Sequence, residues 1–275
     1  MRPLLAVDGD SLAHRAYHGL PSTIRRAGDR PAGALVGFAN MLLGLWESEQ
    51  PRAVVVAWDT LGTPTYRHLS FPAYQGGRHF DDDLLEQLEL LPSHVDACGF
   101  VCAKAPGYAA GDCLAAAAAI EEAAGGRTLV VTSDRDAFQL ASEQTTILQP
   151  LRGVSELTRI GPAGVRERYG IEPSQVSDLI ALRGDPSDKL PGAPGVGPKT
   201  AAAVLREFGS LESALSAGRF AAHAEELLLY RRIASMDASA PLPSLADQTP
   251  QWAEASALAK AWGLRGLADR LGNLG

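Results

Sequence analysis

Residues 182–202 read LRGDPSDKLPGAPGVGPKTAA and combine two aspartates with a glycine-rich turn. Asp185 and Asp188 lie three residues apart in a proline- and glycine-rich context, and carboxylates in a loop suit a hard cation such as Mg²⁺. The turn and the start of the predicted helix after it contribute Gly192, Gly195, Gly197, Lys199 and Thr200. Glycines before a helix let backbone N–H groups approach a phosphate, and a lysine adds positive potential. The stretch therefore predicts metal ligands beside a phosphate-binding turn.

The same stretch resembles the helix–three-turn–helix element of the 5′-nuclease family, which includes flap endonucleases and the 5′–3′ exonuclease domains of bacterial DNA polymerases. The family pattern reads G-D-x-S-D-N-x-P-G-v-x-G-I-G-x-K-T-A, and this chain departs from its polar positions at Lys189, where asparagine is usual. The aspartate pair at fixed spacing makes the match specific, because glycine hairpins alone occur in many DNA-binding proteins. The alternative is an ordinary glycine turn that caps a helix.

Further aspartates follow three short apolar runs that predict buried strands, at residues 3–7, 52–58 and 127–132. The acids that follow these runs are Asp8, Asp59, Asp134 and Asp136. A helical pattern begins at Ser11, and the order strand, acid, helix predicts an α/β sheet with its site at the carboxyl edge. Either Asp8 or Asp59 alone could be a cap or a turn residue. Asp10 is expected to cap the first helix, with a role as an extra ligand as the alternative.

Other segments resemble the family's remaining motifs. The opening motif, an apolar strand followed by D-G-x-x-L-x-x-R-x-[YF], is matched by Asp8, Gly9, Leu12, Arg15 and Tyr17. The motif T-x-D-x-D is intact at 132–136. Residues 66–78 resemble the base of the family's helical arch, which clamps the single-stranded 5′ end, and the resemblance implies DNA contacts for Arg67, Tyr74 and Arg78.

Two motifs depart from the family pattern. Residues 106–115 keep the frame of P-G-x-E-A-D-D-x-[IL]-A, but Ala109 replaces the glutamate and Gly111 the first aspartate, which leaves only Asp112. Gln75 replaces the lysine of Y-K-x-x-R, which the family places at the scissile phosphate. Because all three positions belong to one reaction centre, we expect slow or undetectable cleavage in Mg²⁺.

Seven acids form the candidate metal centre, and the absence of His or Cys from the set favours Mg²⁺ or Mn²⁺ over zinc. They are Asp8, Asp59, Asp112, Asp134, Asp136, Asp185 and Asp188, of which the first five are also the candidate catalytic residues. The resemblance implies one well-occupied cation near Asp134, Asp136 and Asp188, and a second held more weakly by Asp8 and Asp59. It also implies a K⁺ ion held by carbonyl groups of the hairpin.

The resemblance spans residues 4 to 240 and implies two parts. Residues 1–172 are expected to form a PIN-like α/β domain with a central, mostly parallel sheet flanked by helices and an arch near 66–95. Residues 173–240 are expected to form the helix–three-turn–helix region, whose Gly192, Gly195, Gly197, Lys199 and Thr200 would contact duplex backbone. Residues 241–275 are predicted to be a loop and a short helix.

Bulk composition limits the remaining possibilities. The 275 residues contain no apolar run long enough to span a membrane, so no membrane partner is expected. The three cysteines lack a zinc-like pairing and are odd in number, which indicates a protein of the reducing cytoplasm. A DNA-acting protein is expected there at the nucleoid, and this one is expected to be a monomer. The net charge of −7 is unusual for a DNA-binding protein, but a carboxylate-rich metal site concentrates negative charge that bound cations offset.

Converging acids and a phosphate-binding hairpin together predict a structure-selective nuclease. Two hard cations can activate water and stabilise the leaving oxygen of a phosphodiester. The resemblance implies a 5′–3′ exonuclease or flap endonuclease that acts on 5′ flaps and on branched or gapped duplex in replication and repair. One alternative is a DNA-structure-binding member with weak or no catalysis. Another is a PIN-type ribonuclease, which would not need the helix–three-turn–helix region.

Overall fold

The computed structural model describes residues 2–60, 62–77, 80–152 and 154–274. Its centre is a six-stranded sheet with the order β5-β4-β1-β6-β7-β8. The strands are β1 (Leu4–Asp8), β4 (Ala53–Ala57), β5 (Val101–Ala103), β6 (Thr128–Val131), β7 (Thr145–Arg152) and β8 (Glu156–Ile160). All neighbours are parallel except β7 and β8, which pair antiparallel. A separate two-stranded ribbon joins β2 (Arg25–Arg26) to β3 (Arg30–Pro31).

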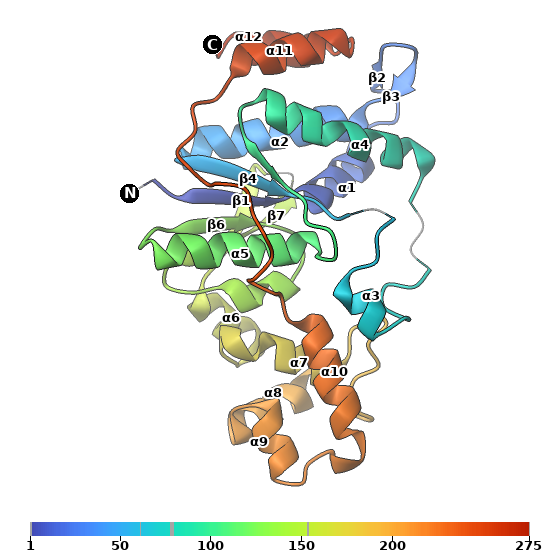
Figure 1. Ribbon diagram of the computed structural model, residues 1–275, viewed down its shortest axis with the longest axis vertical. Helices are drawn as coiled ribbons and strands as arrows, with labels where there is room; N and C mark the ends of the chain where they lie inside the picture. Colours follow the sequence, from blue (N-terminus) through green and yellow to red (C-terminus); the bar gives the residue numbers. More distant parts are fainter. Residues whose placement is uncertain (1, 61, 78–79, 153, 275) are drawn as a thin grey trace.

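Helices cover both faces of this sheet (Figure 1). Leu5 and Val7 of β1 pack toward α1 (Gly9–Gly19), α2 (Gly33–Glu49) and α4 (Asp82–Ala97), whereas Leu4 and Ala6 pack toward α5 (Ala110–Ala123). Strands buried on both faces are near-continuous apolar runs, which is why the runs in the sequence identified β1, β4 and β6. The predicted α/β fold with a mostly parallel, helix-flanked sheet is confirmed.

The chain runs outward from β1 in both directions, first to β4 and β5 and later to β6 and β7. A parallel α/β sheet opens a crevice at its carboxyl edge where the strand order reverses. The ends of β1, β4 and β6 meet at that point, so the acids that follow these strands are brought to one edge.

The second region is helical and lies to one side of the α/β domain, at the bottom of the view in Figure 1. It contains α7 (Val176–Arg183), α8 (Pro198–Phe208), α9 (Leu211–Ser216) and α10 (Ala224–Ala234), with short 3₁₀ turns at Pro173–Gln175 and Ala221–His223. The helix α6 (Pro162–Tyr169) leads into it from β8, and a further 3₁₀ turn at Asp136–Leu140 lies between β6 and β7. Residues 182–202 run from α7 to α8, as a helix–turn–helix element requires. None of the helices formed by the described residues is long and apolar enough to cross a membrane.

Two segments differ from the sequence-based expectation. The stretch expected to form an arch contains a short α3 (Tyr66–Ser70), but its second half is α4, which packs on α2 through buried Leu84, Leu88 and Leu91. The apolar face of that helix places it in the layer over the sheet. The C-terminal segment forms two helices, α11 (Trp252–Ala261) and α12 (Arg265–Gly272), where the sequence predicted one.

Candidate metal centre

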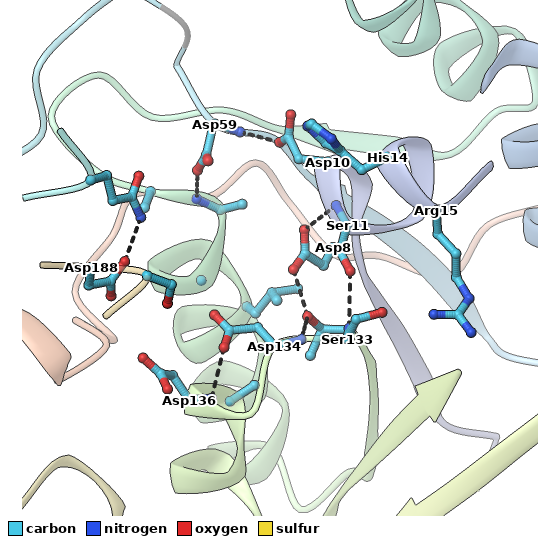
Figure 2. A pocket seen from close by; sticks show the side chains of 18 of the residues that line it. Asp8, Asp10, Ser11, His14, Arg15, Asp59, Ser133, Asp134, Asp136 and Asp188 are labelled. Atoms are coloured by element: carbon cyan, nitrogen blue, oxygen red, sulfur yellow. Dashed lines mark hydrogen bonds between the residues drawn. The ribbon is translucent and has the colours of Figure 1, made fainter. Parts of the chain in front are cut away.

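A groove of about 1550 Å³ crosses the carboxyl edge of the sheet. Its walls come from α1, α2, the segment after β4, α3, the first turn of α5, the segment after β6, the loop at 187–188 and the end of α10. Six aspartates line it, namely Asp8, Asp10, Asp59, Asp134, Asp136 and Asp188 (Figure 2). Five of the seven predicted acids are therefore brought together, and Asp10 joins them.

The β1 and β4 side of the groove holds Asp8, Asp10 and Asp59. Asp8 caps α1 by accepting a hydrogen bond from Ser11 N at 3.0 Å, and its other oxygen accepts one from Thr132 Oγ1 at 2.6 Å. Asp10 does not cap the helix as predicted, because its Oδ2 accepts the backbone N–H of Asp59 at 2.7 Å. Burial, reinforced by the neighbouring carboxylates, raises the pKa of Asp8 to about 7 and that of Asp10 to about 8.

The other side of the groove holds Asp134 and Asp136, which follow β6, and Asp188 from the loop at 185–188. Asp134 Oδ1 accepts the backbone N–H of Asp136 at 2.9 Å, which shapes the turn between them. Burial raises the pKa of Asp136 well above its usual range, and nearby carboxylates add to the shift in the order Asp134, Asp188 and Asp185. Carboxylates close to one another raise one another's pKa in this way, and Asp134, Asp136 and Asp188 line the same groove.

Asp185 and Asp188 have different surroundings although they share a loop. Asp185 Oδ1 accepts the backbone N–H of Ser187 at 2.8 Å, and Asp185 Oδ2 lies 3.7 Å from the Arg183 guanidinium. This carboxylate organises the loop. Asp188 lines the groove, where its Oδ1 accepts a hydrogen bond from Gln75 Nε2 at 3.0 Å.

Asp112 and Arg67 were predicted to bind a metal and DNA, respectively, but the structure pairs them with each other. The Asp112 carboxylate is fully buried and receives two hydrogen bonds from the Arg67 guanidinium, at 2.7 and 2.8 Å. It also accepts the backbone N–H groups of Ala109 and Asp237. Because the carboxylate and the guanidinium bind each other in this buried pair, the geometry indicates a structural role for both residues.

Of the remaining predicted arch residues, Tyr74 is only 7% exposed, and its ring packs edge-on against His68 with centroids 5.0 Å apart. This favours packing over base stacking. Arg78 lies outside the described residues.

The predicted hairpin is exposed and tightly turned. Gly192 and Gly195 have φ of 75° and 73°, and a Cβ on Gly192 would lie 2.4 Å from the nitrogen of Gly184. Only glycine allows this left-handed backbone and this close crossing at low cost. Gly197 precedes α8, and Lys199 and Thr200 lie exposed in its first turn, which leaves backbone N–H groups accessible to a phosphate.

The kind of ligand atoms in the groove indicates which metal it can bind, although the ligands are not arranged around an ion. Among the described residues, no group of three or more His, Cys, Asp or Glu side chains is already arranged to hold an ion. The six aspartates in the groove nevertheless supply only oxygen donors, the type that Mg²⁺ and Mn²⁺ prefer, and a cation would relieve their repulsion. The donor set therefore fits a hard divalent cation.

Residues that the sequence reasoning missed are polar partners from distant segments. Gln75 was noted only for a missing charge, and its bond to Asp188 joins positions 113 residues apart. Gln139 lies behind Asp136, where its side chain bonds the carbonyl groups of Asp136 and Ala234 and the N–H of Met236. No short-range spacing in the sequence predicts contacts of this kind.

Comparison with known families gives two adjoining matches. A model described as 5′-3′ exonuclease, N-terminal resolvase-like domain, matches residues 3–170. A second, described as 5′-3′ exonuclease, C-terminal SAM fold, matches residues 171–256. Together they cover both regions of the fold.

Similar proteins include much longer polymerases. DNA polymerase I of Mycobacterium tuberculosis is 43% identical over 212 residues, covering 76% of this chain and 23% of that protein. DNA polymerase I of Bacillus caldotenax is 33% identical over 285 residues, covering 98% of this chain and 32% of that protein. The chain thus spans less than a third of the length of these relatives.

Solved structures share the fold at low identity. T5 5′-exonuclease with bound zinc aligns with a TM-score of 0.70 and 19% identity, covering 98% of this chain and 97% of that one. The catalytic core of Rad2 in complex with DNA substrate aligns with a TM-score of 0.60 and 16% identity, covering 98% and 91%.

Proposed function

The chain belongs to the 5′-3′ exonuclease family, and from this we propose that it is a structure-selective 5′ nuclease that hydrolyses phosphodiesters at 5′ ends or flaps of branched or gapped DNA. The observation that carries the proposal is the convergence of six aspartates in one groove, with the exposed glycine hairpin in the adjoining region. Two proteins of similar fold support the same class of ligand: T5 flap endonuclease has been solved with DNA and metal ions, and the catalytic core of Rad2 with a DNA substrate.

Asp134, Asp136 and Asp188 would hold the better-occupied Mg²⁺ or Mn²⁺ ion, and Asp8, Asp59 and Asp10 a weaker one. Bound divalent ions supply an activated water and neutralise charge on the leaving oxygen. The protein's own groups position the substrate. Backbone N–H groups of the hairpin and the Lys199 ammonium would hold duplex phosphates without reading sequence. We further propose a K⁺ ion at the hairpin carbonyls, a monomeric state, and action on DNA in the cytoplasm, at the nucleoid.

A second candidate function rests on the positions of Ala109 and Gly111. Both line the groove beside Asp59, and neither can supply a carboxylate. Gln75, at the third altered position, is neutral and donates to Asp188. These features favour weak catalysis in Mg²⁺, and they support a DNA-structure-binding role as the alternative. A PIN-type ribonuclease is disfavoured because the matched C-terminal domain accompanies the N-terminal one.

A cleavage assay tests the proposal with 5′-flap DNA, plain duplex and single-stranded RNA, each in Mg²⁺ and in Mn²⁺. We expect cleavage of the flap in Mn²⁺, slower cleavage in Mg²⁺ and none of the RNA. Asp136→Asn is the matched control that should abolish cleavage while leaving flap binding measurable in a filter assay. Tight flap binding without cleavage in either metal would favour the binding role, and cleavage of RNA alone would exclude both DNA functions.

A further inference from the structure

A side-chain bridge joins the loop after α3 to the aspartate loop at 185–188. The Gln75 amide nitrogen donates to Tyr74 Oη at 2.8 Å and to Asp188 Oδ1 at 3.0 Å. Both of its hydrogens are therefore used. Gln75 has φ of 51°, a left-handed conformation that is unfavourable for a non-glycine residue. Backbone in this conformation persists only where the surrounding structure holds it.

Asp188 is the carboxylate of its loop that faces the metal centre. It is 9% exposed and lines the groove, whereas Asp185 is used by Ser187 and Arg183. Asp188 and Asp136 line the same groove (Figure 2). The amide of Gln75 thus reaches Asp188 from the α3 side of the groove, while Asp136 approaches it from the β6 side.

We propose that Gln75 is a positioning residue, whose amide holds the Asp188 carboxylate in the orientation that binds a divalent cation together with Asp134 and Asp136. Carboxylates that bind metals are themselves held by hydrogen bonds, and loss of such a partner typically costs 10- to 100-fold in metal affinity. This inference rests on the divalent-metal centre of the proposed function. Gln75 would thus orient a metal ligand, a role that is not evident from the replacement of a lysine by a neutral residue.

The bridge also couples two parts of the groove. Gln75 lies on the segment expected to meet the single-stranded 5′ end, and Asp188 lies on the loop that leads into the hairpin. An ammonium group at position 75 would lie beside the Asp188 carboxylate and would form an ion pair with it in the metal-free protein. The neutral amide can orient the carboxylate without competing as a second cation.

The test measures Mn²⁺ affinity of the full chain, without DNA, from the electron paramagnetic resonance signal of free Mn²⁺. Gln75→Met keeps the volume but removes both donors, and we expect it to weaken Mn²⁺ binding about tenfold. Gln75→Asn keeps an amide that is too short to reach Asp188, so it should show the same loss. The matched control is Gln144→Met, at the opposite edge of the sheet before β7, which should bind Mn²⁺ like the unsubstituted chain.

The outcomes separate this inference from the proposed function. Asp188→Asn should abolish the tight Mn²⁺ site. If the unsubstituted chain shows no tight Mn²⁺ site, the metal centre is absent and both proposals are wrong. If Asp188→Asn binds Mn²⁺ as tightly as the unsubstituted chain, Asp188 is not a ligand and the role of Gln75 is wrong. If Asp188→Asn loses the site but Gln75→Met and Gln75→Asn keep full affinity, only the role of Gln75 is wrong. Circular dichroism of each variant checks that the fold is retained, and the two variants at position 75 guard against misfolding of either one.

Discussion

Two small residues leave the first turn of α5 without carboxylates where it borders the groove. Ala109 precedes the helix and Gly111 lies within its first turn, and both line the cavity beside Asp59. A Cβ on Gly111 would lie 3.0 Å from Met236 Cε, the end of a flexible side chain that can move aside. The scaffold can therefore accept larger residues here at small cost.

We predict that the double change Ala109→Glu and Gly111→Asp increases cleavage of a 5′-flap substrate in Mg²⁺ by about 10-fold to 100-fold or more, because two anionic ligands would raise occupancy of the weaker site. Gln75 is left unchanged because of its bond to Asp188. Initial rates at saturating substrate provide the measurement. Ala119→Glu, exposed on the same helix, controls for added charge. Equal rates for the double variant and the unsubstituted chain would show that Asp10 or another group already fills the gap.

Single residues differ in how well sequence predicts them. Asp8, Asp59 and Asp134 were found because each follows an apolar strand, and parallel strand ends must meet at one edge. Asp112 was assigned to the metal from its motif position, yet its partner is an arginine 45 residues away. A local sequence pattern predicts the sheet edge at which a side chain lies. It does not predict which side chain from a distant segment pairs with it.

At the scale of elements, the Arg67–Asp112 pair joins three segments. Arg67 lies on α3 and Asp112 on α5, and the guanidinium also donates to the carbonyl groups of Ile233 and Ser235 at the end of α10. The pair therefore fixes how the second region's last helix meets the α/β domain.

We predict that Arg67→Met lowers the free energy of unfolding by about 3–5 kcal/mol, because it leaves the buried Asp112 carboxylate without its counter-charge. The double variant Arg67→Met with Asp112→Leu should recover much of that loss, since no buried charge remains. Urea denaturation followed by circular dichroism gives the values. The result that would contradict a structural role is Asp112→Asn with unchanged stability but lost Mn²⁺ binding.

The hairpin before α8 supports a second prediction at this scale. Lys199 is exposed in the first turn of α8, so Lys199→Ala should weaken binding to all duplex sequences about equally. It should also reduce by about one the magnitude of the salt slope, which is the slope of the logarithm of the binding constant against the logarithm of the salt concentration. Fluorescence anisotropy at several salt concentrations measures both quantities. Lys260→Ala, on α11 at the far end of the molecule, is the matched control (Figure 1). An unchanged salt slope in Lys199→Ala would remove the hairpin from the DNA interface.

At the scale of the whole molecule, the C-terminal segment ties the two ends of the fold together. After α10 the chain runs back along the α/β domain (Figure 1). There the Gln248 side chain accepts a hydrogen bond from the N–H of Val54 at 2.8 Å and donates one to its carbonyl at 3.1 Å. The α11–α12 pair then packs on α4 and α2. The sequence predicted the loop and a helix at Trp252, but not this return path, because its contacts join residues about 200 positions apart.

The contact between this C-terminal pair and α4 contains a buried histidine. His94 is 1% exposed, its Nε2 lies 3.7 Å from Cys98 Sγ, and its ring centroid lies 6.3 Å from that of Trp262. Burial lowers the pKa of His94 from 6.5 to about 4. A lowered histidine pKa means that the unfolded chain binds the proton more readily than the folded one between these two values.

The last prediction follows from that difference. The contribution of neutral His94 is fully present above pH 6.5 and is lost as the pH falls toward 4, by at most about 1.4 kcal/mol per pH unit. Asp8, Asp10 and Asp136 act in the opposite sense, because their raised pKa values favour the folded state as they protonate. Comparing the unsubstituted chain with His94→Phe cancels those carboxyl contributions. We expect urea unfolding between pH 7 and 4.5 to show the unsubstituted chain losing more stability than His94→Phe, and His94→Gln to behave like His94→Phe. Parallel pH profiles for all three proteins would mean that His94 is protonated in the fold and that its packing against α11–α12 tolerates the charge.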